Sequence, residues 1–177
     1  TLAEMAKKHT VNQQVVGGNV TFTYSMIQFG ITAVNTLLDN RLQPDKTTYN
    51  YFYFEGKQQT TAGLHYRMRW QKLNVFGETA MTDNGAMATI NGFSFIPLSQ
   101  VNLVVMHRYY SPEYDTFYAT AFSETSRINN ESGFYLGAEI RPYKKWKISA
   151  YADSYRFPWA KYGIDVPSVG ADYLLQA

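Results

Sequence analysis

The stretch TTAGLHYRMRWQ, residues 60–71, decides the fold class of this chain. If it is extended, Ala62, Leu64, Tyr66, Met68 and Trp70 share one face, while Thr61, Gly63, His65, Arg67, Arg69 and Gln71 share the other. An alternation with a period of two residues is typical of a strand. A helix would instead place Arg67 beside Leu64 and leave no continuous apolar stripe.

The length of this alternation says more than its period. Strands of globular proteins usually have about five or six residues, whereas a strand that crosses a bilayer at a tilt needs roughly nine to eleven. Residues 60–71 reach the longer class, with arginines on one face and aromatic or aliphatic side chains on the other. The stretch is therefore typical of a transmembrane β-strand that has one face toward lipid and the other toward water.

The amino-acid composition also fits a transmembrane β-sheet. Aromatic residues make up 16% of the 177 residues, and 15 of them are tyrosines, which suit surfaces that are apolar at one end and wet at the other. Charged residues make up only 17%, against about a quarter in ordinary soluble domains. No run of 18 apolar residues occurs, which excludes a transmembrane helix but not a membrane strand.

Charge and cysteine content exclude several function classes. The net charge of +2 is too small to indicate a nucleic-acid partner. Without cysteine there is no disulfide, thiolate zinc site or cysteine nucleophile. The chain starts at Thr1 and shows no signal peptide, so we expect an excerpt or a trimmed mature segment.

Alternation recurs along the rest of the chain. It predicts about eight antiparallel strands near residues 14–25, 27–37, 60–71, 73–78, 86–96, 101–108, 133–141 and 146–155, with residues 86–96 the least clear. The tail from Arg156 reads as a loop whose last residues begin a possible ninth strand. Residues 1–9, with Thr1 and Glu4 in capping-box spacing, predict a short helical lead-in to a single barrel domain or barrel segment spanning 1–177.

The connections alternate in length. Short turns near Met26, Gln71, Leu98 and Tyr143 alternate with longer connections at 38–59, 81–85, 109–131 and after Arg156. In an antiparallel meander this places every short turn at one rim, as in transmembrane barrels. Trp70 and Trp146 flank short turns on the apolar parity, where a membrane-interface aromatic girdle would lie.

The opposite parity carries the charged candidates. We expect these side chains to face a lumen: His65, Arg67, Arg69, Glu78, Arg108, Glu139, Arg141 and Asp153. Such a lumen would filter or guide a solute. The alternative is a self-neutralising network that keeps the interior wet and rigid.

Signals of catalysis are weak. His65 would need a partner to act as a base or ligand, and His107 lies at a strand end. The chain has no G-x-S-x-G elbow, phosphate loop, zinc spacing or calcium loop. We therefore expect no catalytic residue, metal or cofactor.

The second half of the chain resembles a known family. The segments MHRYYSPEYDTFYATAFSETSRINNESGFYLGAEIRP (106–142) and WKISAYADSYRFPWAKYGIDVPSVGADYLLQ (146–176) are similar to the barrel region of Bacteroidetes outer-membrane proteins with a helix-hairpin-helix domain. The resemblance implies an internal part of a longer barrel. The family's helix-hairpin-helix region, often associated with DNA, has no counterpart here, so nucleic acid is a partner only through a region absent from this chain.

These patterns predict an all-β, up-and-down transmembrane barrel, or a segment of one, in the outer membrane of a Gram-negative bacterium. Its partners would be the lipid bilayer and an unknown solute or polymer that passes or is taken up without catalysis; a link to DNA uptake comes only from the family. Two alternatives stay open: an outer-membrane hydrolase acting on lipid, and a soluble ligand-binding barrel with its apolar face inside.

Overall fold

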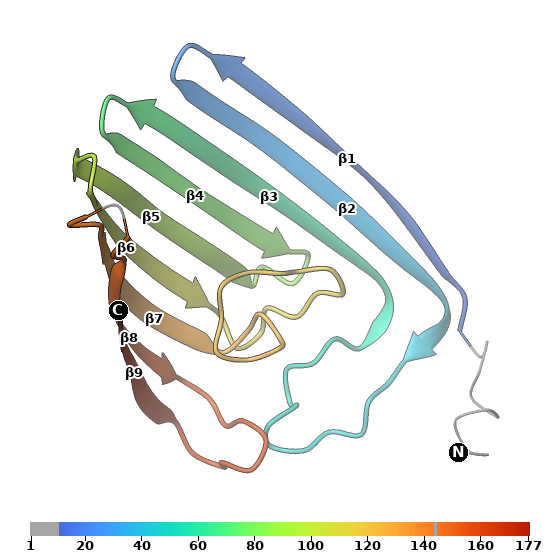
Figure 1. Ribbon diagram of the computed structural model, residues 1–177. Helices are drawn as coiled ribbons and strands as arrows, with labels where there is room; N and C mark the ends of the chain where they lie inside the picture. The colour runs from blue at the N-terminus through green and yellow to red at the C-terminus, as the bar shows by residue number, and fades with distance from the viewer. Residues whose placement is uncertain (1–10, 144) are drawn as a thin grey trace.

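The computed structural model describes residues 11–143 and 145–177, which form one antiparallel sheet (Figure 1). Its nine strands follow each other in chain order: β1 (Gln13–Tyr24), β2 (Ile27–Leu42), β3 (Gly56–Trp70), β4 (Leu73–Thr82), β5 (Met87–Leu98), β6 (Val101–Tyr110), β7 (Glu131–Ile140), β8 (Ile148–Phe157) and β9 (Ser168–Gln176). The predicted helix at residues 1–9 lies outside the described residues. Residues 11–143 and 145–177 contain no helix that is long and apolar enough to cross a membrane.

The all-β antiparallel meander is confirmed, and one detail of the prediction, the strand number, needs correction. The strand number is nine rather than about eight, because the tail forms the complete strand β9 against β8. Within the described residues β1 pairs with β2 and β9 with β8, so the sheet is open and not a closed barrel. Alternation specifies pairing faces, but it carries no information about closure.

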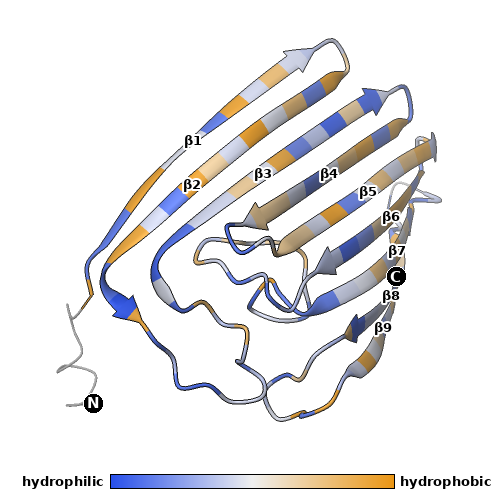
Figure 2. Ribbon diagram, turned by 180° about the vertical axis from the view of Figure 1, so that it is seen from behind, coloured by the Kyte–Doolittle hydropathy of each residue, from blue (hydrophilic) through white to orange (hydrophobic). Residues whose placement is uncertain are grey.

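Residues 60–71 behave as their alternation predicts. In β3, Leu64 is paired with Ile31 of β2 and with Thr79 of β4, and Met68 with Ile27 and Val75. Directly paired residues share a face of the sheet, so these pairs extend the alternation of one strand across its neighbours. Hydrophilic and hydrophobic residues alternate along the strands in Figure 2.

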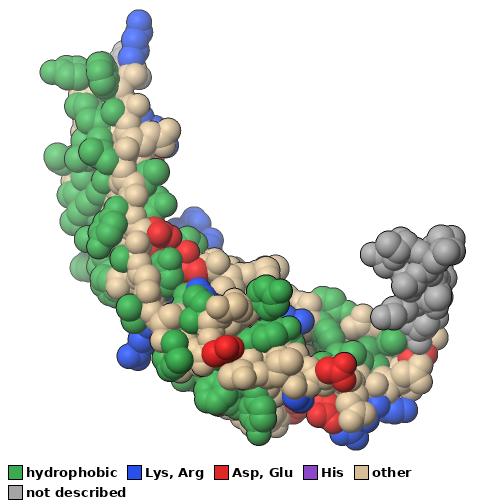
Figure 3. All heavy atoms as spheres, turned by 90° about the horizontal axis from the view of Figure 1, so that it is seen from below, with side chains coloured by type: hydrophobic (Ala, Val, Ile, Leu, Met, Phe, Trp, Pro, Cys, Tyr) green, Lys and Arg blue, Asp and Glu red, His purple; other side chains and the backbone are tan. Residues whose placement is uncertain are grey.

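The sheet curls, and its two faces differ. Hydrophobic side chains cover much of the convex side in Figure 3. Large apolar side chains of this parity are well exposed, with Phe22 at 66%, Leu64 at 48% and Phe134 at 51% of full exposure. The core, in contrast, is a small cluster on the other face: Ala86, Ala88, Tyr110, Tyr114 and Ile128.

The two rims also differ. Two-residue turns join β1 to β2, β3 to β4 and β5 to β6, and residues 141–147 join β7 to β8 at the same rim. At the opposite rim the connections are residues 43–55, 83–86, 111–130 and 158–167. The residues between β6 and β7, 111–130, fold back over the sheet, and we call them the strap (Figure 1).

Candidate functional site

All eight charged candidates lie on one face of the sheet. The register runs across it from His65 to Glu78, Ile90, Arg108 and Gly133. Arg67 and Arg69 lie on the same face of β3 as His65, because they are two and four residues further along the strand. Glu139 and Arg141 share the parity of Gly133 in the same way. Asp153 pairs with Tyr135, which also has this parity. This is the face that the strap covers.

The structure brings only some of these residues together. Arg108 and Asp153 form an ion pair of 2.8 Å, and Arg141 lies 2.8 Å from Glu139. His65 and Glu78 are direct partners in the register of β3 and β4. Arg67 and Arg69 lie exposed toward the short-turn rim, so the eight residues are spread along the face rather than gathered at one centre.

The centre of the candidate site is a buried ion cluster around Arg108. The Arg108 side chain is fully buried; its Nε donates to Glu131 Oε1 at 2.5 Å, and its Nη1 donates to both oxygens of Asp153 at 2.8 and 3.0 Å. Glu131 is 0% and Asp153 2% exposed. A buried charge is tolerated only when it is paired and hydrogen-bonded, and here each charge has a partner.

A glycine makes room for this cluster. Arg108 on β6 reaches Asp153 on β8 by lying across Gly133 of β7, its register partner. A Cβ atom at position 133 would lie 2.5 Å from Arg108 Cζ, a distance that real Cβ atoms do not reach. The missing side chain of Gly133 is therefore what allows a guanidinium to span three strands.

The strap closes over the cluster. Ser123 Oγ donates to Glu131 Oε2 at 2.7 Å, and the Glu124 amide donates to the same oxygen at 3.0 Å. The Phe122 ring lies 4.9 Å from Arg108 Cζ, and its carbonyl accepts a hydrogen bond from the Tyr110 hydroxyl at 2.8 Å. Glu131 thus joins the arginine to the strap, and the ring of Phe122 covers the guanidinium.

Asp115 ties the other end of the strap to the rim. Its carboxylate accepts hydrogen bonds from the Phe54 amide at 2.8 Å and from Arg127 Nη1 at 2.7 Å. Its carbonyl accepts one from Gln59 Nε2 at 2.5 Å. The Thr116 and Thr61 hydroxyl oxygens lie 3.3 Å apart, so the strap also meets β3. These contacts fix the strap at both ends against the same face.

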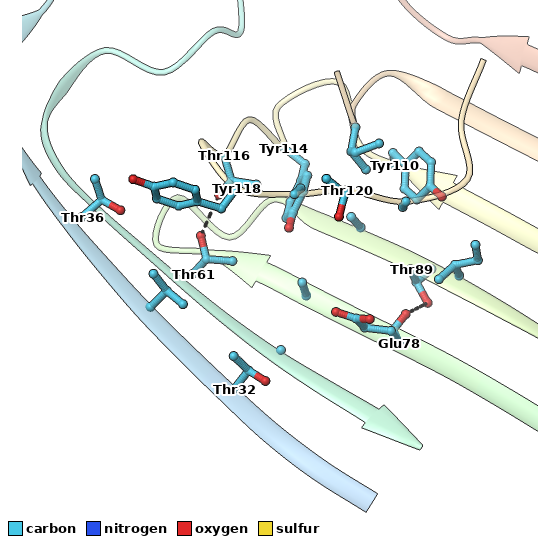
Figure 4. A pocket seen from close by; sticks show the side chains of 18 residues that line it. Thr32, Thr36, Thr61, Glu78, Thr89, Tyr110, Tyr114, Thr116, Tyr118 and Thr120 are labelled. Carbon is cyan, nitrogen blue, oxygen red and sulfur yellow. Dashed lines mark hydrogen bonds between the residues drawn. The ribbon is translucent and has the colours of Figure 1, made fainter. Parts of the chain in front are cut away.

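A pocket remains between the strap and strands β2 to β6 (Figure 4). Its cavity has a volume of about 320 Å³, at the small end of the range typical of ligand sites. Half of its 18 lining residues carry a hydroxyl group, among them Thr32, Thr36, Thr61, Tyr114, Thr116, Tyr118 and Thr120. Glu78 is the only charged side chain among the lining residues.

The electrostatics of the strap follow from its position. Burial, with a contribution from the Glu78 charge, raises the pKa of Tyr114 to about 12, so this phenol stays a neutral donor at the pocket. Burial also raises the pKa of Glu124; Asp153, Asp172 and Glu131 add to the rise, and Arg108 opposes it. Arg108 Nη2 lies 3.6 Å from Glu124 Oε1, too far for a hydrogen bond, so the pairing is weak.

Two members of the site were not among the predicted residues. Glu131 ends the connection predicted at residues 109–131, whereas the structure places it at the start of β7, in the same alternation as Gly133, Tyr135 and Glu139. Extending that alternation by one more step would have found it. Glu124 has no such signal, since it lies in the strap and reaches the cluster only through tertiary folding.

The two histidines of the described residues, His65 and His107, lie apart on the sheet. His65 and His107 lie on opposite faces of the sheet. His107 pairs with Phe134 on β7, which is on the apolar face. On the other side, the register leads from His107 through Asn91 and Gly77 to Tyr66, which is also on the apolar face. In residues 11–143 and 145–177 no three side chains of the metal-binding types gather as a metal site would need. Trp70 and Trp146, the predicted interface aromatics, are 54% and 59% exposed near the short-turn rim.

Comparison with known proteins adds no family. No protein-family model matches the chain, and no curated protein or solved structure shows significant similarity to it.

We predict that Arg108→Met releases the strap. It leaves Glu131 and Asp153 buried without a cation, which typically costs about 3 to 5 kcal/mol. Urea unfolding should report this loss, and limited proteolysis should cut within residues 111–130. The matched control is Arg141→Met, whose side chain is 62% exposed and whose loss should cost less than about 1 kcal/mol. Equal effects of the two substitutions would contradict the role of the cluster.

We predict that Glu124→Gln stabilises the protein at neutral pH. The raised pKa means that charged Glu124 is less favourable in the folded protein than in the unfolded chain, a cost that is complete at pH 7. The cost shrinks as the pH falls through the raised pKa and is gone below the ordinary value of 4.5. The urea midpoint of the variant should therefore exceed that of the wild type at pH 7 and equal it below pH 4.5. Glu55→Gln, at the exposed pair with Arg41, should show no such gain.

Proposed function

We propose that this chain forms wall strands of an outer-membrane β-barrel that lets a small hydrophilic solute pass, or takes it up, without catalysis. The observation that carries the proposal is the division of the sheet into an exposed apolar convex face and a polar face that holds the strap. A bilayer-spanning barrel requires this division, with lipid outside and water inside.

The convex face is too apolar to be an ordinary wet surface. Phe22, Phe29, Leu64, Phe134 and Leu136 lie on it with 44 to 66% of their surface exposed. They belong to strands β1, β2, β3 and β7, so exposed apolar side chains recur across the sheet rather than in one spot. Apolar surface on this scale marks a membrane or a large interface.

The polar face suits water and a selective passage. The strap narrows the space in front of β3 to β6, in the way that an inward loop narrows a channel. The hydroxyl-lined pocket beneath it offers donors and acceptors to a small polar solute, with Glu78 as its only charge. A neutral or cationic solute fits this lining better than an anion.

The orientation argues against the soluble ligand-binding barrel. That fold encloses its apolar parity, whereas here Leu64 and Phe134 lie on the convex side of the curl and the buried arginine lies on the other. The outer-membrane hydrolase would need a base beside a nucleophile, and within residues 11–143 and 145–177 neither His65 nor His107 is hydrogen-bonded to such a group.

We predict that Trp70 and Trp146 contact lipid. Variants that retain one tryptophan each should be reconstituted in bilayers of brominated lipid, which quenches fluorescence on contact. Trp70 should be strongly quenched because it is exposed on the apolar face of β3, and Trp146 because it is exposed in the connection before β8. Trp159 serves as the internal control, because it lies at the long-loop rim with its indole N–H bonded to the Thr48 carbonyl. Quenching of Trp70 and Trp146 no stronger than that of Trp159 would refute the membrane proposal.

We predict that the strap limits which solutes pass. In proteoliposomes of the membrane-extracted protein, Arg108→Met should speed swelling in solutions of larger sugars, because the strap no longer narrows the lumen. Thr61→Cys with Thr116→Cys, added to this variant, should restore the limit on oxidation and lose it on reduction, since the two hydroxyl oxygens are only 3.3 Å apart. If neither the Arg108→Met substitution nor oxidation of the cysteine pair changes the swelling rate, the strap does not control passage.

A further inference from the structure

A second pocket lies at the long-loop rim, and we call it the rim pocket. Its walls come mainly from the connection 43–55, the strap and the connection 158–167. The two connections lie side by side at this rim (Figure 1). The cavity has a volume of about 390 Å³, within the range typical of ligand sites. It shares no lining residue with the hydroxyl-lined pocket under the strap, so it is a separate site.

Aromatic rings form much of the lining of the rim pocket. They are Tyr49, Phe52, Tyr53, Phe157, Trp159 and Tyr162. The Tyr49 and Tyr162 rings meet edge to face, with centroids 5.3 Å apart. An edge-to-face contact leaves ring faces uncovered, so these rings can still stack on a ligand. Tyr162 is 83% and Trp159 37% exposed, more than rings that packed only on one another would be.

Hydrogen bonds fix Trp159 in the rim pocket. Its indole N–H donates to the Thr48 carbonyl at 2.8 Å, and its amide donates to Asn130 Oδ1 at 2.7 Å. Asn130 Nδ2 donates back to the Trp159 carbonyl at 3.0 Å. Three connections thus hold one ring in place. A ligand that stacks on it therefore meets a surface that is already ordered, which lowers the entropic cost of binding.

A tight turn presents Lys161 and Tyr162. The Lys161 amide donates to the Ile164 carbonyl at 2.9 Å, and the Ile164 amide donates back to the Lys161 carbonyl at 2.8 Å. Gly163 has a φ of 79°, as the third residue of a type II turn requires. The backbone under both side chains is therefore fixed as well.

The rim pocket carries positive charge. Arg127 and Lys161 line it, and none of its described lining residues is acidic. Arg127 Nη1 forms an ion pair with Asp115 at 2.7 Å, so its charge is already balanced. Lys161 Nζ lies 3.7 Å from the centroid of the Phe157 ring and pairs with no carboxylate of the described chain. Its ammonium group is therefore available to an anionic ligand.

We propose that the rim pocket binds a saccharide that carries an acidic group. The C–H groups on one side of a sugar ring are weakly positive and pack on the negative face of an aromatic ring. The acidic group pairs with Lys161. Ser126 and Asn129 also line the pocket, and their side chains hold no hydrogen bond within the described chain, so they offer donors and acceptors to sugar hydroxyls.

The ring geometry favours a sugar over a nucleotide. A nucleobase is flat on both sides and is typically bound by stacking between two side chains. The ring pairs among the described lining residues meet at 66 to 88°, so none offers two parallel faces to a base. A sugar needs only one ring face, with polar groups around its edge. The proposal is independent of the barrel, because it depends only on the connections at this rim.

Trp159 reports binding directly. With Trp70→Phe and Trp146→Phe it is the only tryptophan of the chain, and its fluorescence is titrated with uronic, sulfated and phosphorylated mono- and disaccharides and with their neutral counterparts. We expect a saturable change with an acidic saccharide, at an affinity about tenfold above that of its neutral counterpart. No binding by any acidic saccharide would overturn the proposal. It would also be overturned if inorganic phosphate bound as tightly, or if AMP bound more tightly than ribose 5-phosphate.

Two substitutions with matched controls locate the site. Lys161→Met keeps the stem on the Phe157 ring and should weaken the acidic saccharide about tenfold without changing the neutral one. Tyr162→Ala should weaken both. The controls are Lys57→Met, outside the pocket at the same rim, and Tyr143→Ala, 76% exposed near the opposite rim. A substitution that acts no more strongly than its control would overturn the proposal.

The proposed barrel is judged separately. If the titrations fail while lipid quenches Trp70 and Trp146, the saccharide site is wrong and the barrel stands. If saccharide binding follows Lys161 and Tyr162 while Trp70 and Trp146 are unquenched, the site stands without the barrel.

Discussion

An unbroken antiparallel ladder is the constraint on which the rest of this structure depends. Each strand hydrogen-bonds to the one before it, so directly paired residues share a face and one parity extends across nine strands. A shift of one residue in any pair would turn Leu64 or Phe134 to the polar face and Arg108 to the apolar one. The two faces therefore keep their different chemistry only because the register is kept from β1 to β9.

The second constraint is the buried charge of Arg108. A guanidinium on an exposed sheet face is solvated by water at little cost. Here the strap excludes water from Arg108, so its charge is stable only because it forms ion pairs with Glu131 and Asp153. Burial is the main reason why the pKa of Glu124 is raised, and the nearby negative charges, Asp153 first among them, add to the rise. Burying these charges costs energy, and in return the contacts of Glu131 place the strap in one position.

The strap and the apolar convex face support one proposal together. An exposed apolar sheet face alone would suit any large interface, and a polar face with a fixed inward loop alone would suit many binding proteins. Their combination on opposite sides of one curled sheet is what a membrane channel wall needs: lipid contact outside, water inside, and a constriction that does not depend on catalysis. In the proposed channel, Glu78 and the surrounding hydroxyl groups would favour neutral or cationic solutes at that constriction.

The sequence by itself determined the strands, their antiparallel order, the alternation of short and long connections and the face of each charged candidate, because these features depend on local period and turn spacing. Tertiary structure alone decided that residues 111–130 fold back over the sheet, that Arg108 crosses Gly133 to reach Asp153, and that Glu124 and Glu131 join them. It also decided that nine strands form an open sheet. The strap contacts join residues that are far apart in the chain, so no local sequence period predicts them. Whether the sheet closes depends on what pairs with its two edge strands, and the alternation within each strand carries no information about that.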